Sequence, residues 1–396
     1  MHPTVAQRSI SASTALLLLT LLPTPTLAES DIKPGLLLNV ESQILYDDNV
    51  YRLAKKEISD SIFVIKPTIS WYAVQDAHQF TVNYRGDYGR YFDENHLDYT
   101  GHDFTAQAKL EHSSRLKTDY TLGYHKGFDD PGSTDGLLLP GEKPDKWEEA
   151  SLDTLVEYGN NDSHGQITGQ IKYQETEYTN NNQDYRDSNK LQGTGTFYYR
   201  VAPRTRLLFE LSYTDADYQE DDIFGSNQSN KEYEYLTGVT WEASAKTTGV
   251  FKIGYRDKQY DNKRFGDITG LALWLDGHWQ PTSHTKVTFG ASRDAEDSSQ
   301  QGSSGSTKTQ MGGGIEHGMT QRIRLTSKFR LSNEDFDGTR NRDDDRKYFS
   351  LGVKYNLLRW LDIGAEYQFE ERDSNLNAFD FTSNVFMLTA KTRFEH

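Results

Sequence analysis

An apolar–polar alternation, repeated along almost the whole chain, limits the possible folds more than any other feature. From about residue 36 to 394, segment after segment places apolar residues at every second position. The stretch LKTDYTLGY at 116–124 puts Leu and Tyr on one face and Lys, Asp and Thr on the other. A helix needs apolar spacings of three and four, whereas a period of two indicates a half-buried β-strand. We count eighteen such segments, so the sequence predicts an all-β protein.

The connections between these segments alternate in length. Short turns are expected near Asp76, Ser113 and Pro203, and long polar loops at 129–146, 219–230, 295–306 and 335–345. Outer-membrane barrels join their strands by short periplasmic turns and longer external loops, whereas a soluble sandwich gives no reason for this alternation. The pattern therefore predicts an up-and-down antiparallel barrel with both termini in the periplasm.

The first residues of the chain predict export. Arg8 gives a positive start, residues 12–22 form an apolar run, and small residues then allow cleavage after Ala28. The run is too short for a transmembrane helix, which needs about 20 residues. We interpret residues 1–28 as a signal peptide and residues 29–396 as a single outer-membrane β-barrel domain.

The composition of the mature chain fits a barrel. No later apolar run is long enough for a spanning helix, and only helices and closed barrels satisfy their backbone groups in lipid. A net charge of −16 and a mean hydropathy of −0.78 suit a barrel, because only alternate strand residues face lipid. We predict a transmembrane antiparallel up-and-down β-barrel of about 18 strands, with about 16 as the nearest alternative, in the outer membrane of a Gram-negative bacterium. Its surroundings would be outer-membrane lipid and lipopolysaccharide.

No constellation in the sequence predicts catalysis. The 11 histidines show no metal-binding spacing, and there is no nucleophile elbow or phosphate-cradling glycine loop. Acidic pairs such as Asp129-Asp130 and Asp221-Asp222 are interpreted as solvated loop charge. The sequence thus predicts a protein that is not an enzyme, with no catalytic residues, no metal site, no cofactor and no nucleic-acid partner.

Charge on the inward face is the best candidate for function. Alternation places both signs there, and the candidates for lining a channel are Arg85, Lys252, Arg256, Arg322, Arg324, Lys328 and Arg330. Two interpretations stay open: a lattice of ion pairs that stiffens the wall, or cations that select anionic solutes. A barrel of this size leaves an aqueous channel unless a loop fills it. The loop 129–146 carries apolar residues that favour inward folding.

Three motifs stand near the N-terminus: YDDNVYR at 46–52, KPTISW at 66–71 and VNYR at 82–85. They resemble the β-barrel porin family of outer-membrane proteins associated with exopolysaccharide and capsule biosynthesis operons. The resemblance implies a pore for polysaccharide export, with a polysaccharide substrate and periplasmic export or synthesis proteins as partners. The alternatives are an uptake porin for small solutes, an outer-membrane enzyme or a surface structural barrel.

Overall fold

The computed structural model describes residues 34–133, 136–160, 162–244, 246–298, 303–338 and 342–395. The predicted signal peptide, residues 1–28, lies outside the described residues. The strands of the described chain are β1 (Gly35–Asp47), β2 (Asp60–Gln75), β3 (His78–Tyr91), β4 (Tyr99–Glu111), β5 (Leu116–Phe128), β6 (Lys146–Tyr158), β7 (Gly165–Tyr178), β8 (Ser188–Ala202), β9 (Thr205–Tyr218), β10 (Asn230–Ser244), β11 (Thr247–Tyr260), β12 (Ile268–Thr282), β13 (Thr285–Asp297), β14 (Ser303–Gly318), β15 (Ile323–Gly338), β16 (Asp343–Leu358), β17 (Leu361–Ser374) and β18 (Phe381–Glu395).

All the strands join in one closed sheet. Each strand is antiparallel to its neighbours in sequence, and β1 closes the ring by pairing with β18, with Leu38 opposite Phe394 and Tyr46 opposite Phe386. Closure leaves no unpaired sheet edge, which lipid would not tolerate. The predicted antiparallel barrel of eighteen strands is confirmed.

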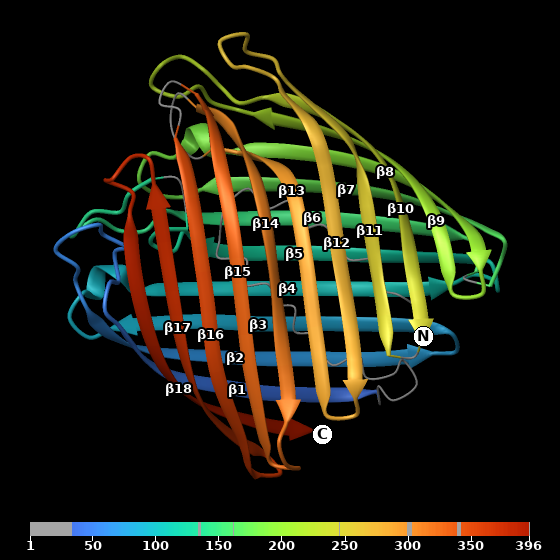
Figure 1. Cartoon of the computed structure of the whole chain (residues 1–396), viewed down its shortest axis with the longest axis horizontal. Coiled ribbons are helices and arrows are strands. Elements are labelled where there is room, and N and C mark those ends of the chain that lie inside the picture. The colour runs from blue at the N-terminus through green and yellow to red at the C-terminus, as the bar shows by residue number, and fades with distance from the viewer. Residues whose placement is uncertain are drawn as a thin grey trace.

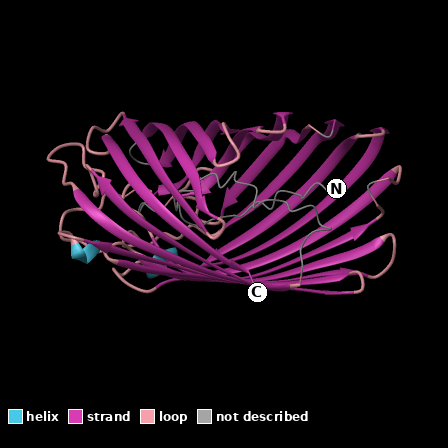
Figure 2. Ribbon diagram, turned by 90° about the horizontal axis from the view of Figure 1, so that it is seen from below, coloured by secondary structure: helices cyan, strands magenta, loops and turns pink. Residues whose placement is uncertain are grey.

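The barrel is flattened. In Figure 1, which looks down the shortest axis, β10–β18 run steeply in front and cross β2–β8, which lie behind them. The crossing is the result of strand tilt on two opposite walls of one barrel. Turned by 90°, the molecule is much wider than it is deep (Figure 2). The helices of the described chain are two short 3-10 turns, η1 (Asn95–Leu97) and η2 (Asp184–Arg186), and none could cross a membrane.

The cross-strand register separates an outward from an inward set of side chains. Leu211 and Leu388 belong to the outward set and are more than half exposed, as expected of side chains that face lipid. The same parity runs through every pairing, for example Phe197 opposite Phe209 and then Leu211 opposite Tyr235. The register shifts only near strand ends, for example between Trp241 and Ser244 of β10. Because the side-chain period is two, the register along the rest of each strand brings the alternate charged residues to the inner wall.

Two predicted loops are largely strand. We expected loops at 295–306 and 335–345, but β13 runs to Asp297, β14 begins at Ser303, β15 ends at Gly338 and β16 begins at Asp343. These segments were predicted to be loops because their residues are polar. A hairpin that projects into water keeps its ladder of backbone hydrogen bonds without apolar side chains.

Candidate functional site

The inner wall differs between its two ends. Toward the middle and the short-turn end, the inward side chains of Arg85 and Arg324 are 58% and 54% exposed. Toward the long-loop end, inward residues such as Arg372, Glu334 and Asp344 are buried. Water therefore reaches the lumen from the short-turn side, and the long-loop side is constricted.

One part of this constriction is loop L3, residues 129–145 between β5 and β6. Its base is held by Arg186 of η2, whose guanidinium lies 2.9 Å from Asp129 and 3.2 Å from Asp145. Arg186 also stacks over the ring of Tyr178, and the indole nitrogen of Trp147 donates to Asp129 at 3.1 Å. The loop thus starts and ends at one buried ion cluster, which fixes its direction.

From this base, L3 crosses the barrel to the opposite wall. The carbonyl oxygen of Gly132 accepts hydrogen bonds from Arg346 on β16 at 2.9 Å and from Arg372 on β17 at 3.4 Å. Gly132 has a φ of +77°, and a Cβ there would lie 2.6 Å from the side chain of Arg52. A side chain at this position would both strain the backbone and push the loop away.

The return half of L3 is packed by apolar contacts. Leu138 lies against a buried cluster in the first two loops and the start of β2, made of Val50, Tyr51, Ile62, Val64 and Leu97. Burial of such side chains is the main source of stability for a loop that has no strand partners. For the described residues of the loop 129–146, the prediction that it folds inward is confirmed.

The motif at 46–52 forms the junction between the first loop and β18. Asp47 is buried, lies 2.7 Å from Arg52 and accepts a hydrogen bond from Ser383 at 3.0 Å. Asn49 is fully buried and donates to the carbonyl groups of Leu53 and Thr382, each at 2.9 Å. The motif therefore stabilises the seam, which is the junction where the first and last strands pair and close the barrel.

A second inward fold closes the other side of the long-loop end. Asp297 at the end of β13 lies 2.8 Å from Lys190 on β8 and 2.5 Å from Lys258 on β11. It also accepts hydrogen bonds from Tyr218 at 2.7 Å and Asn230 at 3.3 Å. One carboxylate thus joins five strands, β8, β9, β10, β11 and β13.

Two of the predicted channel residues belong to ion pairs in the wall. Arg256 is 5% exposed, and its guanidinium contacts Glu232 at 2.8 Å, Asp294 at 2.8 Å and also Glu234. Lys252 lies 2.5 Å from Glu210. For these residues the ion-pair lattice, the first of the two interpretations left open, describes what the structure shows.

The other predicted residues divide into three kinds. Arg85 and Arg324 are exposed in the lumen beside one acid each, Asp103 at 4.0 Å and Glu316 at 3.5 Å. Arg322 was predicted to line the channel, but it lies in the turn before Ile323, outside the strand. The pattern was misleading there because alternation continues into a tight turn.

Lys328 and Arg330 share the inward face of β15, and no carboxylate of the described residues lies within ion-pair distance of either one. Arg330 instead lies over the ring of Tyr348, 5.4 Å from its centre. These two are the predicted candidates whose charge the wall does not neutralise.

The sequence analysis missed Arg346 and Arg372. Both lie on the inward face, directly opposite each other in the β16–β17 register. The alternation pattern did indicate their position. Arg346 is an even number of residues from Lys354 on the same strand, and Arg372 is an even number from Glu366, so each pair shares one face. With them, a line of inward cations follows β15–β17 from the short-turn end to L3, and we call it the cation row: Arg324, Lys354, Lys328, Arg330, Arg346 and Arg372.

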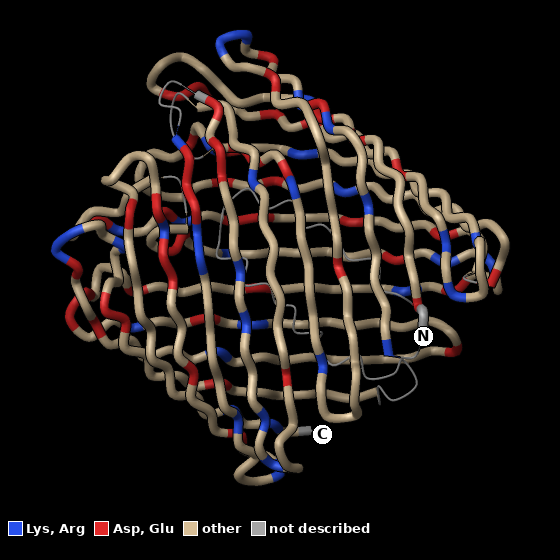
Figure 3. The backbone as a smooth tube through the Cα atoms, in the orientation of Figure 1, with Lys and Arg blue, Asp and Glu red and all other residues tan. Residues whose placement is uncertain are grey.

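The charge distribution supports this description. In Figure 3, Lys and Arg recur along the front strands, while Asp and Glu are concentrated toward the long-loop ends. Among the described residues, no group of three His, Cys, Asp or Glu side chains is placed to hold a metal ion.

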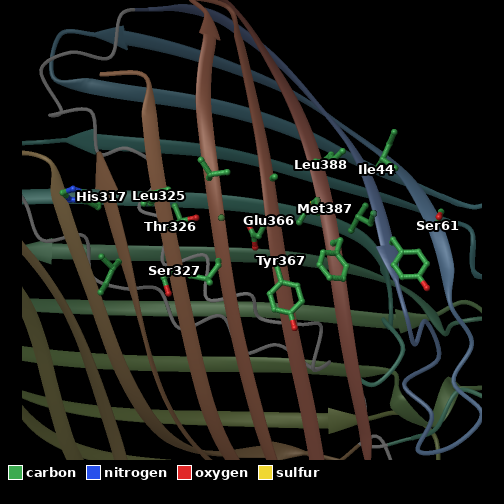
Figure 4. Close-up of a pocket in the computed structure, with 18 residues that line it drawn as sticks. Ile44, Ser61, His317, Leu325, Thr326, Ser327, Glu366, Tyr367, Met387 and Leu388 are labelled. Carbon is green, nitrogen blue, oxygen red and sulfur yellow. The ribbon is translucent and has the colours of Figure 1, made fainter. Parts of the chain in front are cut away.

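A large hollow of about 860 Å³ lies elsewhere, across β14–β18 and β1. Most of its lining belongs to the outward set, including Ile44, Leu325 and Leu388 (Figure 4). It is therefore a concave part of the lipid-facing surface and not a widening of the channel.

One carboxyl group of L3, that of Asp130, has a raised pKa. Burial raises the pKa of Asp130 to about 6, and repulsion from Asp87 acts in the same direction, while Arg52 and Lys66 oppose it. Asp130 lies in the loop, and its backbone carbonyl accepts hydrogen bonds from Ser133 at the tip. Asp130 therefore takes up a proton at a higher pH than an ordinary aspartate does.

The closed sheet, the apolar outer surface, the charged inner wall and the inward loop together define a porin-type β-barrel of the outer membrane. The chain belongs to the family described as "Putative beta-barrel porin 2", whose model matches residues 36–394. It is thus a protein of the outer membrane of a Gram-negative bacterium. Sequence comparison with curated proteins finds no match.

Solved structures agree on the fold. OpdK of Pseudomonas aeruginosa, determined with vanillate, has a TM-score of 0.51 and 10% identity, covering 91% of this chain and 99% of OpdK. OccK9 (OpdG) of the same organism has a TM-score of 0.50 and 12% identity, covering 91% of this chain and 99% of OccK9. At this level of identity the similarity concerns the fold alone.

Proposed function

We propose that this protein is a diffusion channel that carries small anionic solutes across the outer membrane. The observation that carries the proposal is the cation row, which follows one wall of the lumen from the periplasmic end to the constriction under L3. Cations along a narrow path raise the local concentration of anions and lower the barrier to their entry.

The cation row also permits a bound anion to be released. Lys328 and Arg330 have no carboxylate partner among the described residues, whereas Arg324 shares its charge with Glu316. A moving anion would pass from one incompletely neutralised cation to the next. Conduction needs sites of this kind, which are favourable enough to enter and weak enough to leave.

The small-solute proposal has support from one structural neighbour. OpdK was solved with vanillate, which is a small carboxylate. The prediction of polysaccharide export depends on the resemblance to operon-associated proteins alone, and no observation on the described residues favours it. L3 and the Asp297 cluster both narrow the outer end, and a polymer would need more space than a small solute.

The proposal can be tested by flux into proteoliposomes. Sodium glucuronate and glucose have similar size, so their relative rates report charge selection. We expect glucuronate to enter faster, and the double variant Arg324→Gln/Lys328→Gln to reduce this ratio. Lys347→Gln is the matched control, because Lys347 lies on the outward face of β16 and pairs with Glu371 at 2.8 Å. Faster passage of glucose through the unaltered protein would contradict the proposal.

A further inference from the structure

We propose that Arg346 and Arg372 form a binding site for the carboxylate of a solute, at the place that the Gly132 carbonyl of L3 occupies. This inference depends on the proposed function and extends it, because it names the ligand group and the point in the channel where it binds. It gives the constriction a chemical role in addition to its steric one.

The first observation is a juxtaposition of like charges. Arg346 and Arg372 are directly opposite each other on β16 and β17. Side chains in such pairs have Cβ atoms about 4.5–5.5 Å apart, and like charges there destabilise the sheet. No carboxylate of the described residues lies within ion-pair distance of either guanidinium. Their shared partner is one carbonyl oxygen, that of Gly132.

The second observation is unused hydrogen-bonding capacity. The Nε and Nη2 atoms of Arg346 and the Nη2 atom of Arg372 are buried and have no hydrogen-bond partner among the described residues. Buried donors in proteins are almost always satisfied, so three orphaned donors within one pair of residues indicate that a partner is missing. Each orphaned donor is also charged, which makes its burial more costly.

The donors are held in place. Arg372 is 1% exposed, its Nε donates to the carbonyl of Phe379 at 2.5 Å, and its guanidinium lies 4.9 Å from the centre of the Phe381 ring. Arg346 is fixed at one end by Gly132. A site whose donors are already oriented loses little entropy when a ligand binds.

The charges around the pair identify the ligand as an anion. Arg342 is neutralised by Asp344 at 2.9 and 2.5 Å, and Arg52 by Asp47. Glu370 attracts both Arg330 and Arg372 but is not within ion-pair distance of either, and Asp344 also attracts Arg372. Around the pair, four arginines, Arg330 and Arg342 included, therefore face two acids, Asp344 and Glu370, and the site keeps an excess of positive charge.

The geometry favours a carboxylate. A guanidinium presents parallel donors that match the two oxygens of a carboxylate, and such charge-assisted pairs are stronger than bonds to a neutral carbonyl. The side chain of Tyr348, whose ring lies under Arg330 beside the site, could contact the rest of the solute. A carboxylate would compete with the Gly132 carbonyl, so binding would release the tip of L3 from the wall.

The test measures binding without relying on transport. Purified protein in detergent is heated with sodium glucuronate, with glucose, or with sodium chloride at equal ionic strength. A ligand of the folded state raises the unfolding temperature. We expect glucuronate alone to raise it, and Arg346→Gln/Arg372→Gln to weaken the apparent affinity by about tenfold or more. Arg85→Gln, a lumen variant away from the site, should keep the full shift.

The outcomes are distinct. No shift in the unaltered protein, or an equal shift in the double variant, would overturn the site. If the double variant does not fold, Arg346→Gln alone is measured, because Arg346 is less buried than Arg372 and makes fewer contacts.

Alginate oligomers test a second source of carboxylates: a shift with them and not with glucuronate would assign the site to a polymer. If the site binds glucuronate while the channel conducts no anions, the proposed function fails and the site stands.

Discussion

Asp48 and Asn384 are joined by three hydrogen bonds across the seam of the barrel. The backbone amide and the side-chain amide of Asn384 each donate to the Asp48 carboxylate at 2.7 Å, and the Asp48 amide donates back to the Asn384 carbonyl at 3.2 Å. The seam is the one place where the ring joins residues from opposite ends of the chain. Its closure at the outer rim therefore depends on a side chain as well as on the strand ladder.

Replacing Asp48 should loosen this seam. Asp48→Ala removes two hydrogen bonds to a charged acceptor, and we expect a loss of about 1–3 kcal/mol in the free energy of unfolding. Urea titration followed by mobility on unboiled gels would measure it. Asp221→Ala in an exposed loop is the control and should behave like the unaltered protein. An equal effect of both variants would show that the seam does not depend on Asp48.

The two kinds of inward cation should respond differently to loss of charge. Arg256→Gln leaves Glu232, Glu234 and Asp294 close together without their cation, which should cost about 3–5 kcal/mol in the free energy of unfolding. Arg324→Gln affects an exposed side chain and should stay within about 0.5 kcal/mol. Urea unfolding would measure the free energy of unfolding of both variants. Similar stabilities would contradict the division of the cations into wall and channel residues.

Gly132 should be needed to keep the channel narrow. Gly132→Ala strains a backbone with φ of +77° and brings a Cβ against Arg52, so L3 should leave the wall and single-channel conductance should rise. Gly225→Ala in another loop is a close control, since its φ is +68° and its Cβ would meet nothing within 4 Å. A conductance unchanged by Gly132→Ala, or raised equally by Gly225→Ala, would mean that L3 does not set the width.

L3 should close more firmly at low pH. The pKa of Asp130 is raised to about 6 in the folded protein, above its usual value near 4, so the folded loop binds a proton more tightly than a released loop does. This contribution is complete below about pH 4 and is lost as the pH rises through about 6. Conductance should therefore fall between about pH 6.5 and 4.5, and Asp130→Asn should remove that dependence. Persistence of the full pH response in Asp130→Asn would assign it to other groups.

The residue pattern predicted the two faces of the wall well and the contacts between distant parts poorly. Alternation alone assigned Arg85, Lys252 and Lys328 to the inward face, because the parity of a strand is a local property. It could not separate buried Arg256 from exposed Arg324, since the acids around Arg256 lie on β10 and β13 and depend on register and wall curvature.

The contacts that form the constriction could not be predicted from the sequence for a related reason. The pattern indicated which loop folds inward, but the carbonyl of Gly132 meets Arg346 and Arg372 from more than two hundred positions away along the chain. No local period encodes such a contact. The motif at 46–52 likewise suggested a family, and its role at the seam became visible only when β18 was placed beside β1.

The central claim is that the cation row makes the lumen selective for anions. The most direct measurement is the reversal potential of single channels of the unaltered protein in a gradient of potassium chloride. The account predicts a potential of the sign that shows chloride to be more permeant than potassium, and a smaller magnitude in Arg324→Gln/Lys328→Gln. A potential of the opposite sign, with potassium the more permeant ion, would contradict it.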